Sequence, residues 1–206
     1  MIPFKIQDGT RFYDFKSCLA YLHNQGQMMY GKHFKIRKSD CEIIYKLLVY
    51  AIRDEENCKI HNIDPHKGIL LLGPVGCGKT SLMTLIKPFF PKDHQHIIKP
   101  SREVSFEFIS EGYPTILKYG KSPKIYCFDD LGVEKSLKHF GNDCNSMAEI
   151  LLSRYDNFIS SGIPTHATTN LNSEELEKLY GNRVRSRLRE MFNLIAFDKA
   201  ISDKRS

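Results

Sequence analysis

The residues whose types and spacing most clearly indicate chemistry run from Gly73 to Ser81. Gly73, Gly78, Lys79 and Thr80 have the spacing of a phosphate-binding loop. Glycines let successive backbone N–H groups face one concavity, and a following helix would add its positive end. We expect Lys79 to reach the β- and γ-phosphates of a nucleotide, and the Thr80 hydroxyl to bind Mg²⁺, which prefers oxygen. The candidate nucleotide-binding residues are Gly73, Pro74, Val75, Gly76, Cys77, Gly78, Lys79, Thr80 and Ser81.

The sequence on both sides of this loop has the pattern that the motif requires. The short apolar run 69–72 predicts a buried strand, and residues 81–87 can form a helix that stops at Pro88. The alternative is a glycine-rich turn that joins a strand to a helix and binds nothing.

Two adjacent acids follow a second predicted strand. Residues 124–128 are mostly apolar and lead into Asp129 and Asp130. Open α/β sheets bind ligands at the carboxyl ends of their strands, so these acids would lie beside the loop. We expect Asp129 to hold Mg²⁺, and Asp130 to orient or deprotonate the water that attacks the γ-phosphate. The alternative is a pair of acids that opens a turn before Gly132.

A third predicted strand, 165–169, ends at Asn170, and a basic run follows it. Asn170 could hydrogen-bond the attacking water or the γ-phosphate, although helix N-caps and turns also favour asparagine.

One arginine of the basic run could be an arginine finger that stabilises the transferring phosphate in a neighbouring subunit. The alternative is a solvated basic helix. The arginines are Arg183, Arg185, Arg187 and Arg189.

Strand and helix patterns alternate along the chain. Other helices are expected at 14–23, 40–56, 103–118 (interrupted near Gly112 and Pro114), 145–159, 173–180 and 184–191, and other strands at 96–98 and 194–197. Residues 24–31 are expected to be a glycine-containing connection. The alternation predicts an α/β fold, with three α/β/α layers around a five-stranded, mostly parallel sheet.

The composition is that of an ordinary globular protein. Of 206 residues, 41% are hydrophobic and 26% charged, which allows one sizeable domain with a small appendage. No apolar run approaches a membrane span and the N-terminus lacks a signal-peptide layout, so we expect a cytoplasmic protein without a membrane partner. The net charge of +6 permits contact with nucleic acid without establishing it.

The cysteines and histidines lack the spacing of a metal site. The six cysteines are scattered, which argues against a zinc site or a disulfide framework. Cys77 could be oxidised within the loop, but an inert small residue is the simpler interpretation. His61, His66, His94 and His96 are expected at the surface.

The order of these motifs resembles that of AAA+ ATPases. More narrowly, it is similar to the DnaC/IstB group of bacterial helicase loaders and transposase helper ATPases. The resemblance covers about residues 40–206. It depends on the segments 67–80, 128–132, 168–170 with 174–176, and 181–188, and on the ending Ile201-Ser-Asp-Lys-Arg205.

This resemblance implies roles for the acids and the loop. Gly78, Lys79 and Thr80 match the Walker A positions, and Asp129 and Asp130 match Walker B, where many AAA+ proteins have Glu as the second acid.

It also implies roles for three residues nearer the C-terminus. Asn170 matches sensor 1, and Arg187 falls on the arginine-finger position. Arg205 falls near the sensor 2 arginine, but the group ends in Ser-x-Arg and this chain in Ser-Asp-Lys-Arg, which is one residue longer.

The resemblance implies an oligomeric ATPase that uses ATP and Mg²⁺ and acts on DNA, preferably single-stranded. Its protein partner would be a replicative helicase or a transposase, and DNA or that partner would stimulate hydrolysis. Residues 1–38 would form a partner- or DNA-contacting segment with a short helix. Residues 39–206 would form the AAA+-like ATPase domain, without a full C-terminal helical lid.

Two other classes of P-loop protein stay open at this point. A GTPase switch would explain Asp129-x-x-Gly132, but the sequence has no Asn-Lys-x-Asp motif to read guanine. A small-molecule kinase would need an acceptor pocket and a lid, for which the stretch 183–189 is a candidate.

Overall fold

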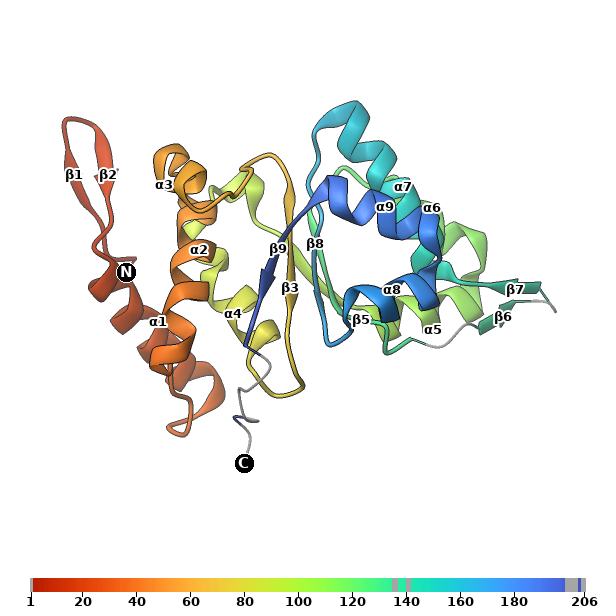
Figure 1. The fold of residues 1–206 in the computed structure, drawn as a ribbon, viewed down its shortest axis with the longest axis horizontal. Helices are drawn as coiled ribbons and strands as arrows, with labels where there is room; N and C mark the ends of the chain where they lie inside the picture. Colours follow the sequence, from red (N-terminus) through yellow and green to blue (C-terminus); the bar gives the residue numbers. More distant parts are fainter. Residues whose placement is uncertain (1, 135–136, 140–141, 199–203, 205–206) are drawn as a thin grey trace. The chain divides into compact units, whose positions relative to one another are not determined.

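The computed structural model describes residues 2–134, 137–139, 142–198 and 204 (Figure 1). The chain divides into two compact units. One unit is built from 1–65 and 80–95, and the other from 66–79 and 96–206. No helix of the described residues is both long and apolar enough to cross a membrane.

The second unit contains the sheet. Its strands lie in the order β4-β5-β8-β3-β9, and every neighbouring pair is parallel. The expected α/β class and five strands are confirmed, and the sheet is wholly rather than mostly parallel. The strands are β3 (Gly68–Leu72), β4 (Ile97–Pro100), β5 (Tyr126–Leu131), β8 (His166–Thr169) and β9 (Phe192–Ala196).

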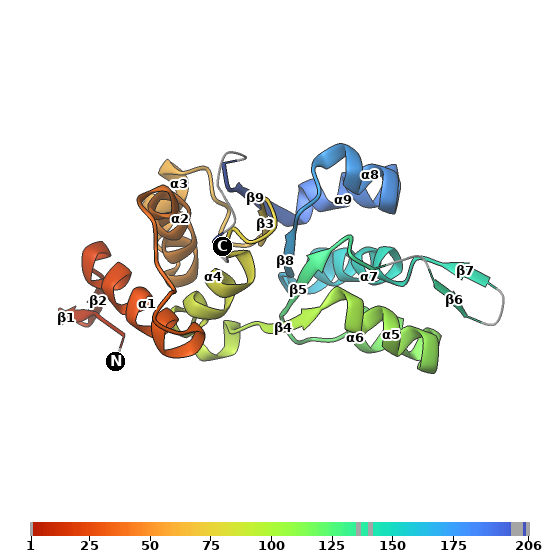
Figure 2. The same ribbon diagram turned by 90° about the horizontal axis from the view of Figure 1, so that it is seen from below.

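Five helices of this unit lie on one side of its sheet, and α5 and α6 lie beside α7 (Figures 1 and 2). Phe128 and Ala167 from the sheet and Ile150 from α7 are fully buried in the core between these layers. The helices are α5 (Ser101–Glu111), α6 (Tyr113–Gly120), α7 (Ser146–Ser161), α8 (Ser173–Tyr180) and α9 (Asn182–Met191). A short hairpin, β6 (Leu137–His139) and β7 (Asn142–Cys144), precedes α7.

Polar side chains and glycines set the ends of these helices. Asn145 caps α7, because its Oδ1 accepts a hydrogen bond from the Ala148 amide at 3.0 Å. Asn172 and Glu175 form a reciprocal capping box at the start of α8. The predicted break near Gly112 is confirmed, since Gly112 separates α5 from α6 with φ of 70°.

The first unit is mostly helical, and two expectations for it were wrong. The helix predicted at 14–23 continues to Tyr30, because Gly26 presents no side chain to the ring of Phe34, which lies against it. The helix predicted at 40–56 is two helices, because Arg53 adopts a left-handed conformation and Asp54 caps the second.

The elements of the first unit also include a hairpin that was not predicted. They are β1 (Lys5–Gln7), β2 (Thr10–Phe12), α1 (Phe15–Tyr30), α2 (Cys41–Ile52), α3 (Glu55–Ile60), α4 (Lys79–Ile86) and single 3₁₀ turns at Lys38–Asp40, Lys87–Phe89 and Lys92–His94. The first residue of α4, Lys79, belongs to the second unit.

His96 is buried, which corrects its expected place at the surface. It is fully buried before β4, where its ring lies edge-on to that of His166 with centroids 5.1 Å apart. Burial, with smaller contributions from His96 and Arg154, holds the pKa of His166 well below its ordinary value. The neutral ring of His166 accepts a hydrogen bond from the Ile69 amide through Nδ1 at 3.1 Å, which fastens β8 to β3.

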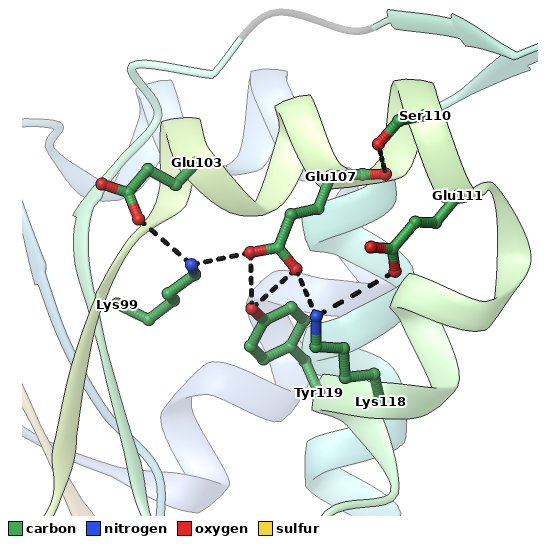
Figure 3. A network of polar contacts seen from close by, with 7 residues as sticks. All are labelled: Lys99, Glu103, Glu107, Ser110, Glu111, Lys118 and Tyr119. Carbon is green, nitrogen blue, oxygen red and sulfur yellow. Dashed lines mark hydrogen bonds and ion pairs between the residues drawn. The ribbon is translucent and has the colours of Figure 1, made fainter.

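A network of hydrogen bonds and ion pairs connects β4, α5 and α6 (Figure 3). The Glu107 carboxylate, from α5, lies 2.7 Å from Lys99 Nζ of β4 and 2.8 Å from Lys118 Nζ of α6, and Tyr119 donates to it as well. Burial alone would raise the pKa of Glu107, but hydrogen bonds from its two lysine partners and Tyr119 lower it to about 2. The folded state therefore favours the charged carboxylate.

We expect Glu107→Gln to lower the free energy of unfolding by about 2 kcal/mol at pH 7. The pKa of the carboxyl is depressed in the folded state, so its contribution is present above the unfolded value and is lost as the pH falls through about 2. The difference between variant and wild type should therefore shrink below about pH 4. Urea unfolding between pH 7 and pH 2 measures it.

Glu111→Gln is the matched control, because Glu111 is half-exposed and lies 4.0 Å from Lys118. We expect a change of less than about 0.5 kcal/mol for this variant. A Glu107→Gln penalty that stays constant across the pH range would contradict the assignment.

Candidate functional site

The order of the strands brings three predicted site segments to one edge of the sheet. β8 lies between β3 and β5, and Thr169 at its end pairs with Leu72 on one side and Leu131 on the other. The strands are parallel, so the loop after β3, the acids of β5 and Asn170 after β8 emerge side by side. This is the edge at which open α/β sheets bind ligands.

The loop after β3 has the backbone that its glycines predict. Gly76 and Gly78 have φ of 76° and 99°, a region that disfavours residues with a Cβ. A Cβ on Gly73 would lie 2.7 Å from Cβ of Phe197, so this position also requires glycine. The loop runs directly into α4, and Thr80 and Ser81 follow Lys79 in the first turn of that helix.

Lys79 and Asn170 are in direct contact. Nζ of Lys79 donates to Oδ1 of Asn170 at 2.5 Å and to the carbonyl oxygens of Gly73 and Pro74 at 2.8 and 3.0 Å. Only 4% of Lys79 is exposed, so these acceptors replace water around the ammonium group. The structure thus brings together two residues that lie 91 positions apart in the sequence.

Asp129 and Asp130 share one hydroxyl group, that of Thr168. Thr168 Oγ1 donates to Asp129 Oδ1 at 2.7 Å and accepts from the Asp130 amide at 2.9 Å. Both acids lie inside β5, which continues to Leu131, whereas the sequence suggested that the strand ends before them. The sequence motif contained Thr168, but its role as a support for both acids was not predicted.

A bulge in β5 sets the direction of the second acid. The pairing of β5 with β8 shifts between Phe128 and Leu131, and Asp130 has φ of 54°. A left-handed, non-glycine residue in a strand is uncommon, and bulges of this kind occur next to active sites, where they redirect a side chain. Asp129 is buried and Asp130 is half-buried, so the two carboxylates have different environments.

Glu134 is a buried residue near the site that the sequence did not point to. Its carboxylate accepts from the Gly132 amide at 2.9 Å and from the hydroxyl of Tyr180, the last residue of α8. Burial raises the pKa of the Glu134 carboxyl, and the hydrogen bonds from Tyr180 and from backbone amides oppose this effect. The contact ties the turn after the acids to the end of α8.

The basic run forms α9, and its arginines have different surroundings. Arg183 and Arg189 are exposed, and Arg185 pairs with Glu177. The guanidinium group of Arg187 lies over the ring of Tyr155, 4.8 Å from its centroid. The structure therefore places Arg187 against Tyr155 of α7 in the same chain.

The tail after β9 also contacts the loop. The Lys204 amide donates to the Gly76 carbonyl at 3.1 Å, and its Nζ lies 5.4 Å from the ring centroid of Phe197. Sequence reasoning selected Arg205 instead, which lies outside the described residues.

The residues present suit a magnesium nucleotide. Thr80 and Asp129 offer the oxygen ligands that Mg²⁺ prefers. Within the described residues, no three His, Cys, Asp or Glu side chains gather as a metal cage, and Mg²⁺ typically uses one or two protein ligands together with phosphates. Cys77 is fully buried, and burial raises the pKa of its thiol, which agrees with an inert role.

We expect Thr168→Val to lower the free energy of unfolding by about 2 kcal/mol, because it leaves the buried Asp129 carboxylate and the Asp130 amide without their shared partner. Thr115→Val is the matched control. Thr115 is equally buried, but its hydroxyl makes no hydrogen bond in the described part of the chain, so its replacement should be neutral or stabilising. Urea unfolding of both variants measures the difference, and equal penalties would refute the supporting role of Thr168.

No protein-family model matches the chain, and no curated protein matches its sequence. Solved structures do match its fold. The DnaC helicase loader aligns over 80% of this chain and 93% of its own, with 24% identity and a TM-score of 0.57. DnaI aligns over 73% of this chain and 84% of its own, with 24% identity and a TM-score of 0.51. AMPPCP-bound DnaA from Aquifex aeolicus aligns over 84% of this chain and 50% of its own, with 16% identity and a TM-score of 0.51. The chain has the fold of the AAA+ P-loop NTPases, in the form seen in the DnaC helicase loader.

Proposed function

We propose that this chain is an ATP-binding and ATP-hydrolysing AAA+ protein that acts on DNA in the manner of a helicase loader. The observation that carries the proposal is the contact between Lys79 of the phosphate-binding loop and Asn170 at the end of β8. It joins the two motifs at the sheet edge where a nucleotide would bind, in a fold shared with the DnaC helicase loader. AMPPCP, bound to the similar DnaA, supports an adenine nucleotide over a guanine nucleotide.

The loop residues 73–81 would bind the phosphates. Lys79 would exchange its contacts with the Gly73 and Pro74 carbonyls for phosphate oxygens while keeping its place beside Asn170. Thr80 and Asp129 would hold Mg²⁺, which neutralises charge on the phosphates. Lys204, whose amide already binds the loop, would add a further positive charge, and we propose the same for its neighbour Arg205.

Asp130 and Asn170 would handle the attacking water. The bulge turns Asp130 away from the regular path of its strand, which suits a group that must orient or deprotonate a water molecule. Asn170 would hydrogen-bond that water or the γ-phosphate, with Lys79 fixing its amide group.

An arginine from a neighbouring subunit would complete the site. Arg187 lies on Tyr155 of its own subunit, so we propose that it serves the nucleotide of the next subunit in an oligomer. Arg183 is exposed one turn before Arg187 and would lie beside it, whereas Arg189 is exposed on another side of the helix.

The partner would be a replicative helicase in the cytoplasm, and a transposase is the second candidate. Residues 1–38 would contact DNA or that partner, and 39–206 would form the ATPase domain. The likeness in fold to the DnaC helicase loader and DnaI supports the helicase as first choice.

The proposed ATPase activity is tested with the purified full chain, with and without single-stranded DNA. We expect Lys79→Ala to lower turnover at least about 100-fold, because it removes the charge that binds the transferring phosphate. Lys121→Ala, at an exposed lysine after α6, is the control and should keep full activity. Turnover that does not need Lys79, or that prefers GTP, would contradict the proposal.

The arginine finger is tested by mixing subunits. We expect Arg187→Ala to lower turnover about 1,000-fold with little change in ATP affinity. A mixture of Arg187→Ala and Lys79→Ala subunits should regain activity, because an intact loop can then meet an intact arginine across the subunit contact. Arg189→Ala is the control, because Arg189 is exposed on another side of the same helix. Arg187→Lys keeps a positive charge beside Tyr155 and tests whether that charge is enough to preserve the fold. An equal loss of ATP binding, or no recovery on mixing, would exclude this role.

A further inference from the structure

The positive charge of this protein is concentrated at its N-terminal end. Seven of the first 38 residues are lysine or arginine and two are aspartate, so this segment carries +5 of the net +6 charge of the chain. No acidic residue occurs between Asp14 and Asp40, and Asp40 is only 1% exposed. Asp8 and Asp14 offset part of this charge at the start of the segment, whereas residues 15–39 contain five basic residues and no carboxylate, a pattern that attracts polyanions.

The positive charges lie at the two ends of α1. Lys5, Arg11 and Lys16 are exposed at its start, in and beside the β1–β2 hairpin. Lys32, Lys35 and Lys38 are exposed in the segment that follows its end. The segment after α1 folds back, because Phe34 packs against Gly26, which lies eleven residues after Phe15. At 1.5 Å per residue the two groups are therefore about 16 Å apart along the helix, so a ligand that contacts both must be an extended chain of negative charges.

The hairpin presents an apolar ring beside this charge. Asp8 and Gly9, with φ of 49° and 78°, form its two-residue turn. Lys5 is paired with Phe12, so the two side chains lie on one face of the ribbon, and the Phe12 ring is 52% exposed.

The rings at the base of the hairpin have a different role. Phe4 and Tyr13 have centroids 5.8 Å apart, and Tyr13 lies 6.1 Å from Phe89. These contacts anchor the hairpin within its own unit, whereas Phe12 contributes its ring to the surface. Figures 1 and 2 show the hairpin standing off the start of α1.

We infer that the β1–β2 hairpin and the two ends of α1 form a binding surface for single-stranded DNA. Phosphates would meet the lysines and arginine, and a base would stack on Phe12. A duplex hides the faces of its bases, so the exposed ring favours a single strand. A protein strand paired along the hairpin edge would gain little, because each strand has only three residues. This inference rests on the proposed function only in the choice of DNA as the polyanion.

The experiment measures the binding of a fluorescent oligo(dT) to the full chain by anisotropy, without nucleotide and at several salt concentrations. We expect the triple variant Lys5→Gln, Arg11→Gln, Lys16→Gln to lose at least about 10-fold in affinity at low salt, with a shallower salt dependence. The triple variant Lys32→Gln, Lys35→Gln, Lys38→Gln should behave in the same way.

Substitutions of Phe12 test the contribution of base stacking separately from that of charge. We expect Phe12→Ala to lower affinity about 10-fold without changing the salt dependence, and Phe12→Trp to preserve binding. The control variant replaces three exposed lysines of the other unit, Lys121, Lys124 and Lys178, with glutamine and should bind as wild type. Thermal unfolding confirms that each variant is folded.

Three results would overturn the inference. Equal losses in the control variant would mean that only overall charge matters. Stronger binding to duplex together with a neutral Phe12→Ala would assign the surface to double-stranded DNA. If the wild type did not bind oligo(dT), the proposed binding surface would be refuted. The proposed ATP hydrolysis would be unaffected by that result, because the Lys79→Ala experiment tests it separately.

Discussion

The parallel order β5-β8-β3 is the constraint on which the rest of the structure depends. Placing β8 between the other two strands puts Thr168 beside the acids and Asn170 beside the loop lysine. Each of these contacts joins residues far apart in the sequence, and each needs strands that end at the same edge. If β8 lay at the margin of the sheet, the Lys79 ammonium would be buried without its amide partner, which is costly.

Much of this arrangement could be predicted from local sequence. The glycines of the loop are separated as the phosphate motif requires, and the apolar runs of β3 and β5 mark buried parallel strands. The hairpin that was not predicted also has a local signal, because Asp8-Gly9 is a pair typical of its two-residue turn. Signals of this kind lie within a few residues of one another, so one sequence is enough to read them.

The remaining features depend on contacts that no local pattern contains. The left-handed Asp130 and the bulge around it follow from pairing with β8, 38 residues further on. The burial of His96 depends on His166. The length of α1 depends on Phe34, which packs where Gly26 lacks a side chain. In each case tertiary packing overrides the preference of the local sequence.

The hydrogen bond between Glu134 and Tyr180 connects two distant parts of the fold. Glu134 also accepts a hydrogen bond from the turn that follows the acids, and Tyr180 ends α8 only two residues before α9 begins. Gly181, with φ of 85°, is the single joint between those helices. The turn after the acids is thus connected to the start of the helix that carries Arg187 through one side-chain hydrogen bond and one glycine, so the position of that helix is coupled to the position of the acids.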